Sequence, residues 1–101
     1  MVRGVSLSSV LVNYLDHVEI DHQGAVPVYR QLAAILRARI RSGHYEPGRA
    51  VPSEKQCEQE WGVARGTCRK AIALLRDEGL VVTVAGRGSY VADPLPDEDE
   101  G

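Results

Sequence analysis

The stretch from residue 52 to residue 80 most constrains how this chain can fold, because it reads as two short helices joined by a tight turn. Ser53 can cap a helix, and Gln56 three positions later completes a capping-box pattern. A helix is therefore predicted over about residues 54–61. Gly62 supplies the backbone freedom that ends this helix.

The second helix of this stretch has two chemically distinct faces. It is predicted over residues 65–78 and is closed by Gly79. On a helical wheel of about 100° per residue, one side holds Cys68, Ala71, Ile72 and Leu75, and another groups Arg65, Arg69 and Arg76 with Gly66 and Lys70 flanking them. One face can pack while the other meets a polyanion, which is the layout of a helix-turn-helix that reads DNA. Arg65 and Arg69 occupy the first turns, which approach base edges in a recognition helix.

An alternative exists for the same helix. A helix with an apolar stripe and three arginines is commonly an ordinary amphipathic helix whose polar face is simply solvated. The neighbouring elements favour the DNA-reading interpretation over this one.

Charge is distributed unevenly along the 101 residues. The formal net charge is −2, yet residues 27–91 hold 11 basic and 6 acidic side chains, a surplus of +5. Residues 1–26 carry −2 and residues 92–101 carry −5. The overall charge therefore conceals a basic central block that suits a nucleic-acid partner.

Length, cysteine content and spacing exclude several classes of protein. A chain of 101 residues makes one small domain with a modest core. Two cysteines are too few for a disulfide scaffold, and no secretory signal or membrane-length apolar run occurs, so a reducing cytoplasm is expected. The three histidines lack a metal-binding spacing, and no nucleophile–base pair or phosphate loop is visible. We therefore expect no metal, no cofactor and no enzymatic activity.

Two further segments precede the central stretch. Residues 1–26 form an N-terminal extension, with helical spacing of apolar residues over about residues 6–16 and a strand-like alternation over residues 18–21. This extension is either a leader packed on the domain or a dimerisation arm. A longer helix is predicted from Pro27 to about Ser42.

A β-hairpin is predicted after the second helix. Two β-rich runs, residues 80–84 and 89–91, flank a glycine-rich turn in which Arg87 stands between Gly86 and Gly88. Such an arginine suits a narrow groove or a phosphate, although a plain hairpin with an exposed arginine has the same pattern.

The predicted fold is α+β and mainly helical: a winged helix-turn-helix of three helices followed by a β-hairpin wing. This domain is assigned to residues 27–92, and the helical and strand-like extension of residues 1–26 precedes it. Residues 93–101 combine prolines with a run of carboxylates, so a disordered acidic tail is expected there.

The amino-acid sequence of these segments resembles that of the N-terminal DNA-binding domain in the GntR family of bacterial transcriptional regulators. The resemblance rests on PVYRQLAAILRARIRSGHYEPG, VPSEKQ, WGVARGTCRKAIALLRDEGLV and GRGSYV, and it covers residues 27–91. It implies contacts to the DNA backbone from Lys55 and Thr67, to the major groove from Arg65 and Arg69, and to the minor groove from the wing of Gly86, Arg87 and Gly88. Gly66 and Lys70, beside the arginines, complete the predicted DNA-binding set.

This chain departs from the family pattern in three ways. Ala64 replaces the usual Ser, so the recognition helix lacks its expected cap, worth about 1 kcal/mol. Cys57 and Cys68 replace Leu and Val; they are either two small core hydrophobes or a thiol-based redox or metal switch. The family's C-terminal effector domain is also not expected here, because only the acidic tail follows the wing.

The combined expectation is a cytoplasmic bacterial transcription regulator, associated with the nucleoid when bound to DNA. We expect a repressor that acts as a homodimer on a palindromic operator of double-stranded DNA. The alternative is a protein-interaction module that pairs with a full-length regulator or another partner and binds DNA weakly or not at all.

Overall fold

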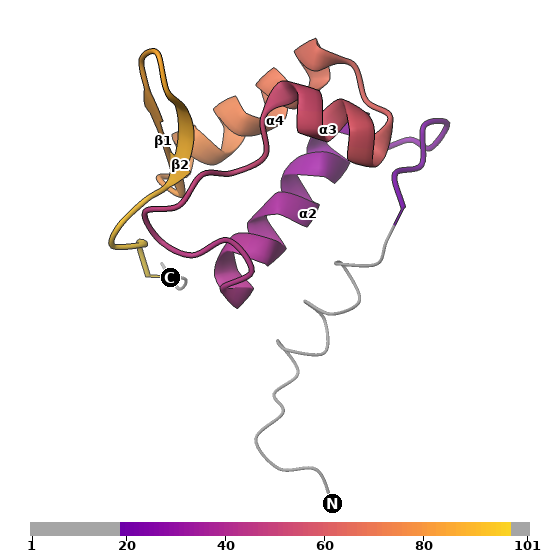
Figure 1. Ribbon diagram of the computed structural model, residues 1–101. Coiled ribbons are helices and arrows are strands. Elements are labelled where there is room, and N and C mark those ends of the chain that lie inside the picture. Colours follow the sequence, from indigo (N-terminus) through magenta and orange to yellow (C-terminus); the bar gives the residue numbers. More distant parts are fainter. Residues whose placement is uncertain (1–18, 98–101) are drawn as a thin grey trace, which may run out of the picture.

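Three helices and a two-stranded antiparallel hairpin make up residues 19–97, the part of the chain that the computed structural model describes (Figure 1). The helices are α2 (Val28–Ser42), α3 (Glu54–Trp61) and α4 (Arg65–Asp77). The hairpin is formed by β1 (Val81–Val84) and β2 (Gly88–Val91). This arrangement confirms the mainly helical winged helix-turn-helix that the sequence predicts.

Local capping signals set the helix boundaries. At the start of α3, Ser53 Oγ accepts the Gln56 backbone N–H at 3.1 Å, and the Gln56 side chain accepts the Ser53 N–H at 2.8 Å. This is the predicted capping box. Gly62 ends α3 in the left-handed conformation, with φ 65°. Helix α4 ends one residue earlier than predicted, because Glu78 serves as its C-cap.

A single hydrophobic core joins all of these elements. Its largest fully buried aliphatic side chains come from α2, α4 and the base of the hairpin: Leu32, Leu36, Ile40, Leu75, Leu80, Val81 and Val91. The buried Cys57 joins α3 to them. Removing each such side chain from water contributes roughly 1.5–3 kcal/mol. The apolar faces of α2 and α4 therefore meet, which leaves the basic face of α4 outside.

The wing is tied to the body by the loop that joins α2 to α3. The hairpin pairs Val81 with Val91 and Thr83 with Ser89. The Val51 N–H donates to Ser89 O at 3.0 Å, and the Val91 N–H donates to Arg49 O at 2.8 Å. This loop therefore lies along β2 much as a third strand would.

The expected strand over residues 18–21 is wrong for its described part, because residues 19–21 are irregular and a turn follows at His22 and Gln23. The cause is Gln31 of α2. Its side chain accepts the Asp21 backbone N–H at 2.8 Å and donates to Asp21 O at 2.9 Å, which occupies the groups that a strand partner needs. The predicted helix of residues 6–16, and the rest of the extension to residue 18, lie outside the described residues.

The segment after the wing also differs from its expectation. Residues 93–97 were expected to begin a disordered tail, but Leu95 packs against the core. In addition, Arg41 Nη1 donates to Pro96 O at 2.7 Å. Residues 98–101 lie outside the described part of the chain. Apolar packing and one charged donor thus extend the folded domain beyond the wing.

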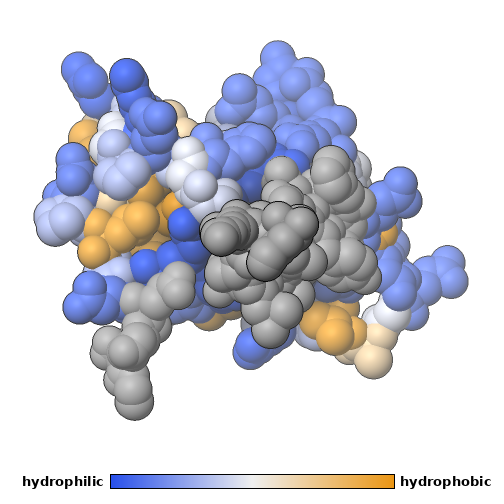
Figure 2. All heavy atoms as spheres, turned by 90° about the horizontal axis from the view of Figure 1, so that it is seen from below, coloured by the Kyte–Doolittle hydropathy of each residue, from blue (hydrophilic) through white to orange (hydrophobic). Residues whose placement is uncertain are grey.

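The surface is mostly polar. On the face that Figure 2 shows, hydrophilic side chains dominate the described surface, and hydrophobic ones gather in small patches. Among the described residues, the large hydrophobic side chains that remain exposed are Val26, Val82 and Val84. Within residues 19–97, no helix is both long enough and apolar enough to cross a membrane.

Candidate nucleic-acid interface

The turn between α3 and α4 exposes the first turns of α4. Val63 is buried in this turn and anchors it to the core. Arg65 and Gly66 are exposed, whereas Thr67 is half-buried. A Cβ built on Gly66 meets nothing within 4 Å, so the space in front of it is open. The start of α4 is therefore accessible to a large partner.

Arg69 is oriented by a carboxylate of α3. Its Nε donates to Glu54 Oε2 at 3.0 Å, and its Nη2 donates to Glu54 Oε1 at 3.2 Å. Hydrogen bonding to the Arg69 guanidinium lowers the pKa of Glu54, and the same bond raises the pKa of Arg69. The Arg69 side chain is nevertheless 69% exposed. The sequence pattern identified this arginine but gave no sign of its partner.

Arg65 of α4 and Lys55 of α3 are two further exposed cations. Arg65 Nε is 3.7 Å from Glu58 Oε1, a loose ion pair in which the Arg65 side chain is 61% exposed. Lys55, in the first turn of α3, is exposed as well. These contacts leave both cations available to a polyanion.

Three polar residues that the sequence analysis left out of the site bridge α4 and the wing. Arg76 Nη1 donates to Thr83 Oγ1 at 2.9 Å, and Thr83 Oγ1 lies 3.1 Å from Ser89 Oγ. Thr83 and Ser89 are paired across the hairpin. Two features of the sequence could have identified these residues: Arg76 lies on the basic face of the helix, and the two predicted strands carry polar residues.

A groove of about 450 Å³ runs between α4, the start of α3 and the wing. Its basic and hydroxyl-bearing lining consists of Ser53, Arg69, Arg76, Thr83, Arg87 and Ser89. Glu54 also lines it, but its charge is paired with Arg69. The groove therefore presents positive charge and hydrogen-bond donors together, which suits a phosphate backbone.

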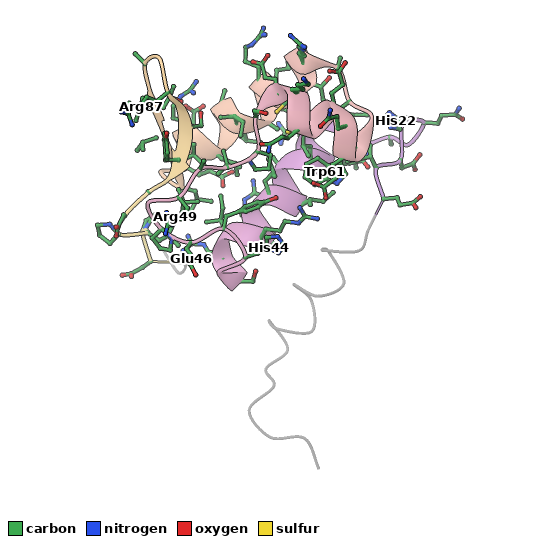
Figure 3. The ribbon with its side chains drawn as sticks, in the orientation of Figure 1. His22, His44, Glu46, Arg49, Trp61 and Arg87 are labelled. Carbon is green, nitrogen blue, oxygen red and sulfur yellow. The ribbon has the colours of Figure 1, made fainter. Side chains whose placement is uncertain are left out.

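The wing tip holds the predicted arginine between two glycines. Gly86 has φ 77° and Gly88 has φ 125°, conformations that side-chain-bearing residues rarely adopt. The Arg87 backbone N–H donates to Val84 O at 2.9 Å, which closes the turn. Its side chain is exposed on the hairpin, apart from Trp61 and His22 at the other side of the molecule (Figure 3).

Lys70 is not brought together with these residues. Its Nζ lies 5.1 Å from the centroid of the Tyr29 ring, a cation–π contact that turns it toward α2. Among the predicted site residues, the structure thus places Arg69, Arg87 and Gly88 in the lining of the groove. The other predicted residues lie outside this lining: Lys55, Arg65, Gly66, Thr67, Lys70 and Gly86.

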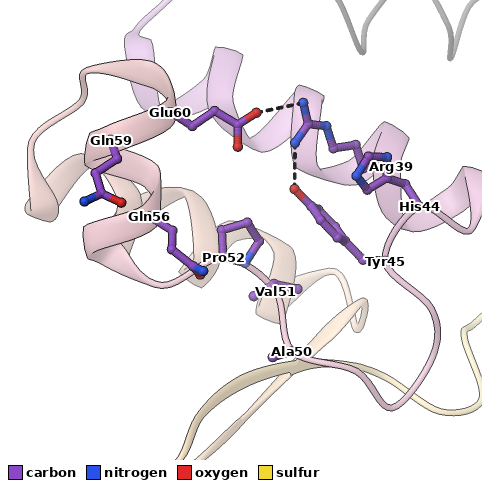
Figure 4. A pocket seen from close by; sticks show the side chains of 9 residues that line it. All are labelled: Arg39, His44, Tyr45, Ala50, Val51, Pro52, Gln56, Gln59 and Glu60. Atoms are coloured by element: carbon purple, nitrogen blue, oxygen red, sulfur yellow. Dashed lines mark hydrogen bonds and ion pairs between the residues drawn. The ribbon is translucent and has the colours of Figure 1, made fainter.

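A second hollow, of about 630 Å³, lies between α2, the loop that follows it and α3, and it is lined by Arg39, Tyr45 and Glu60 among others (Figure 4). Arg39, only 9% exposed, donates to Tyr45 Oη at 2.8 Å and to Glu60 Oε2 at 3.1 Å. Its guanidinium also lies 5.0 Å from the Trp61 ring centroid. Burial raises the pKa of Tyr45, and the bond from Arg39 partly offsets that rise. These contacts hold α2, its following loop and α3 together.

Acidic and metal-ligating side chains do not converge in the part of the chain that is described. Among residues 19–97, no group of three His, Cys, Asp or Glu side chains could hold a metal ion. His22 and His44 lie on different parts of the molecule (Figure 3).

Comparison with known proteins places this geometry in a family. Residues 28–91 match the family described as bacterial regulatory proteins, gntR family. The chain belongs to the GntR family. The match covers all three described helices and the wing, so the family's domain contains the whole groove. Family and relatives are transcription regulators rather than enzymes.

Curated members of the GntR family are similar over most of this chain. It is 34% identical over 77 residues to the transcriptional repressor NagR of Bacillus subtilis, and 37% identical over 70 residues to MngR, a mannosyl-D-glycerate transport/metabolism system repressor of Escherichia coli. These matches cover 76% and 69% of this chain but only 32% and 29% of the relatives. The chain thus spans about a third of their length.

Solved GntR-family structures share the fold. The AraR DNA-binding domain in complex with its operator ORE1 aligns with a TM-score of 0.65 and 35% identity, covering 71% of this chain and 88% of that one. YtrA from Sulfolobus acidocaldarius, a GntR-family transcription factor, aligns with a TM-score of 0.66 and 33% identity over 74% of this chain and 79% of its own.

Proposed function

We infer that this chain is a sequence-specific, DNA-binding transcriptional regulator that reads duplex DNA with α4 and the wing. One observation carries the proposal: Arg69, Arg76 and Arg87 line a single groove between a helix and a hairpin. A phosphate backbone fits this groove if α4 enters the major groove and the wing enters the adjacent minor groove. The fold shared with the operator-bound AraR domain supports the same placement.

The geometry at Arg69 supports a base-reading role. Glu54 occupies Nε and one N–H of Nη2, so the Nη1 and remaining Nη2 donors stay free along the outer edge of the guanidinium. A pair of donors in this arrangement matches O6 and N7 of guanine. We assign Arg69 to a base edge, and Arg65, one turn earlier on the same side, to a neighbouring base.

Other residues set the register on the sugar–phosphate backbone. Lys55 and Thr67 contact phosphates on either side of α4, and Gly66 allows the backbone of the DNA to approach closely. Arg76 contacts the phosphate that crosses the groove, and its bond to Thr83 fixes its direction. Lys70, held against Tyr29, reinforces the contact between α4 and α2 and adds long-range attraction.

The wing supplies the minor-groove contact. Arg87 enters the groove while Gly86 and Gly88, which have no side chains, let the strand backbones approach the DNA. An arginine in a narrow minor groove gains from the enhanced negative potential there. This contact would add a preference for sequences whose minor groove narrows beside the major-groove site.

We further propose a homodimer on a palindromic operator, with residues 1–26 as the dimerisation arm. The described N-terminal segment and the wing lie at opposite sides of the helices (Figure 1). Beside that segment, a largely apolar hollow of about 390 Å³ is lined by Ala25, Val26, Ala34 and Ile35. A partner chain bound there would leave both DNA-reading faces uncovered.

The relatives favour repression, and a chromosomal target favours a cytoplasmic location. NagR and MngR are named as repressors, and we propose the same sign of regulation for this chain. A regulator of this kind works where the chromosome lies, so we place it in the cytoplasm, on the nucleoid when it is bound to DNA.

The test is selection of bound sequences from a pool of random duplexes, with affinities then measured at low and physiological salt. We expect an enriched palindrome with guanines at the Arg69 positions, and its half-site spacing reports the geometry of the dimer. Enrichment of a single half-site would support sequence-specific DNA binding and refute the proposed homodimer. Weak, salt-sensitive binding without enrichment would instead support the partner-dependent interaction module.

A further inference from the structure

The only two cysteines of the chain face each other inside the helix-turn-helix. Cys57 is in the middle of α3 and Cys68 is in the first turn and a half of α4, and both are free thiols that are 0% exposed. Their sulfur atoms are 2.7 Å apart. A disulfide needs about 2.05 Å between the sulfurs, so the two thiols are less than one bond length from covalent contact.

The surroundings make the two thiols chemically unequal. The hydrogen bond between the two sulfur atoms lowers the pKa of Cys68 against the opposing effect of burial, and the neighbouring Arg69 also lowers it. The same hydrogen bond, together with burial and the carboxylates of Glu60 and Glu54, raises the pKa of Cys57. Cys68 therefore forms the nucleophilic thiolate more readily than Cys57 does.

Cys68 is also the sulfur that a small oxidant can approach. It contributes to the lining of the groove between α4 and the wing, beside Arg69 and Ile72. Its zero exposure means that the side chains above it must move before a reagent arrives, so the reaction depends on local opening of the groove. A molecule the size of a hydroperoxide needs only a small opening.

We propose that Cys57 and Cys68 form a reversible intramolecular disulfide when the protein meets a hydroperoxide. The Cys68 thiolate attacks the peroxide oxygen and takes up one oxygen atom, which gives a sulfenic acid and, after protonation, the alcohol or water that leaves. The Cys57 sulfur then attacks the Cys68 sulfur, and its proton leaves with the sulfenic oxygen as water. In sum, two thiols lose two electrons and two protons, and one peroxide bond is reduced.

The bond would join the two helices that carry the DNA-reading residues. Cys68 immediately precedes Arg69, and Cys57 lies one turn after Glu54, the partner of Arg69. Crosslinking residues 57 and 68 closes a short loop that contains the whole turn, which restricts the unfolded chain. The oxidised protein should therefore unfold at a higher temperature than the reduced protein.

The experiment treats the purified full chain with hydrogen peroxide and maps its tryptic peptides without reduction. Trypsin cleaves after Lys55, Arg65 and Arg69, so the expected product is peptide 56–65 joined to peptide 66–69. Its mass is lower by two hydrogen atoms than that of the two free peptides, and dithiothreitol separates them. The single variants Cys57→Ala and Cys68→Ala serve as controls and should give no crosslink; circular dichroism establishes that each has folded.

Two outcomes would overturn the proposal. These are free thiols in the folded wild-type chain after peroxide, or oxidation of one cysteine to a sulfinic acid without a crosslink. A crosslinked chain that unfolds at a lower temperature than the reduced one would refute the expected stabilisation. The mapping of the wild-type chain decides the matter even if a variant fails to fold.

A second experiment links the thiols to DNA binding. This experiment, unlike the peptide mapping, rests on the proposed DNA-binding function. If DNA covers the groove, a duplex enriched in the selection should slow crosslinking several-fold relative to the protein without DNA. Equal rates with a duplex that does bind would show that Cys68 is not reached through the groove and would overturn that route. A chain that binds no duplex would refute the DNA-binding function and leave the peptide mapping unaffected.

Discussion

Arg69 shows how a single residue can be both paired and available. Its two-point contact with Glu54 uses one edge of the guanidinium, and the outer edge stays in solvent. An exposed ion pair of this type contributes little to stability. Its main effect is to limit the orientations of the Arg69 side chain, which reduces the entropy lost when Arg69 binds a base.

At the residue scale, replacing Arg69 and replacing Lys55 should change DNA affinity in different ways. Replacing Arg69 with Ala should cost roughly 1–3 kcal/mol on the selected operator and little on random DNA, because a base contact is lost. Replacing Lys55 with Ala should weaken both duplexes alike and reduce the salt slope by about one unit, because a phosphate contact is lost. Fluorescence anisotropy at several salt concentrations measures both. Equal losses on the two duplexes for Arg69→Ala would refute its base-reading role.

Replacing Glu54 with Gln separates orientation from charge. Removing a negative charge from the DNA-facing side should tighten binding to random DNA, while the loosened Arg69 should lower the ratio of operator to random affinity by about threefold to tenfold. Glu58→Gln is the comparison, because it removes the same charge from the same helix and leaves Arg69 held, while its own pair with Arg65 is a single loose contact at 3.7 Å rather than two hydrogen bonds. Competition binding with the two duplexes gives the ratio. An unchanged ratio in Glu54→Gln would mean that the ion pair does not orient Arg69 for reading.

At the scale of elements, the wing and α4 form one unit through Arg76 and Thr83. Replacing Arg76 with Ala should weaken binding to all duplexes by about tenfold and flatten the salt dependence, because both a phosphate contact and the brace of the wing are lost. Arg37→Ala is a charge-matched control, since Arg37 is paired with Glu78 and lies outside the groove lining. Salt titration by anisotropy distinguishes the two. Identical behaviour of the two variants would assign Arg76 to the solvated surface.

The N-terminus of α4 offers a gain in stability. Ala64 has the extended N-cap conformation, φ −68° and ψ 154°, but no side-chain oxygen to accept an N–H of the first turn. Ala64→Ser should therefore raise the free energy of unfolding by about 1 kcal/mol. Urea denaturation followed by circular dichroism measures the change, with Ala64→Gly as a reference that tests backbone effects alone. A lower midpoint for the Ser variant would contradict the capping explanation.

The accuracy of the sequence predictions depended on how local each interaction is. The capping box of α3 lies within four residues, and the sequence predicted that helix with correct bounds. The irregular path at Asp21 depends on Gln31, ten residues away, and the position of Pro96 depends on Arg41, fifty-five residues away. Neither pattern is visible in a local window. The same limit applies to the candidate site. The spacing of the arginines is visible in the sequence, but the partners of Arg69 and Arg76 become apparent only in the folded chain.

At the scale of the whole molecule, the contacts of Arg39 with Tyr45, Glu60 and Trp61 hold three segments together, and the stability of the protein should therefore depend on pH. The pKa of Tyr45 is raised above its ordinary value of 10.0, so the folded state keeps the phenol protonated at a pH where the unfolded state loses the proton. The stability contributed by this group is fully present below about pH 10 and is lost as the pH rises through the folded value. Alkaline conditions should therefore loosen the junction of α2, its loop and α3.

Replacing Tyr45 with Phe tests this dependence. At neutral pH the variant should be less stable by about 1 kcal/mol, because Arg39 loses a hydrogen-bond acceptor. The difference between wild type and variant should shrink as the pH rises above about 10, since only the wild type has the phenol to titrate. Urea unfolding across this range gives both curves. A difference that grows with pH would contradict the direction of the shift.

The pairing of the α2–α3 loop with β2 has a consequence for the timescales of motion. Backbone N–H groups at Gly48, Val51 and Val91 are bonded between loop and strand, so they should exchange with deuterated solvent as slowly as the core helices do. The wing tip has only its own turn bond at Arg87 and should exchange early. The hairpin therefore combines a stiff root with a pliable end, and the end can follow variations in groove width while the root keeps α4 in register.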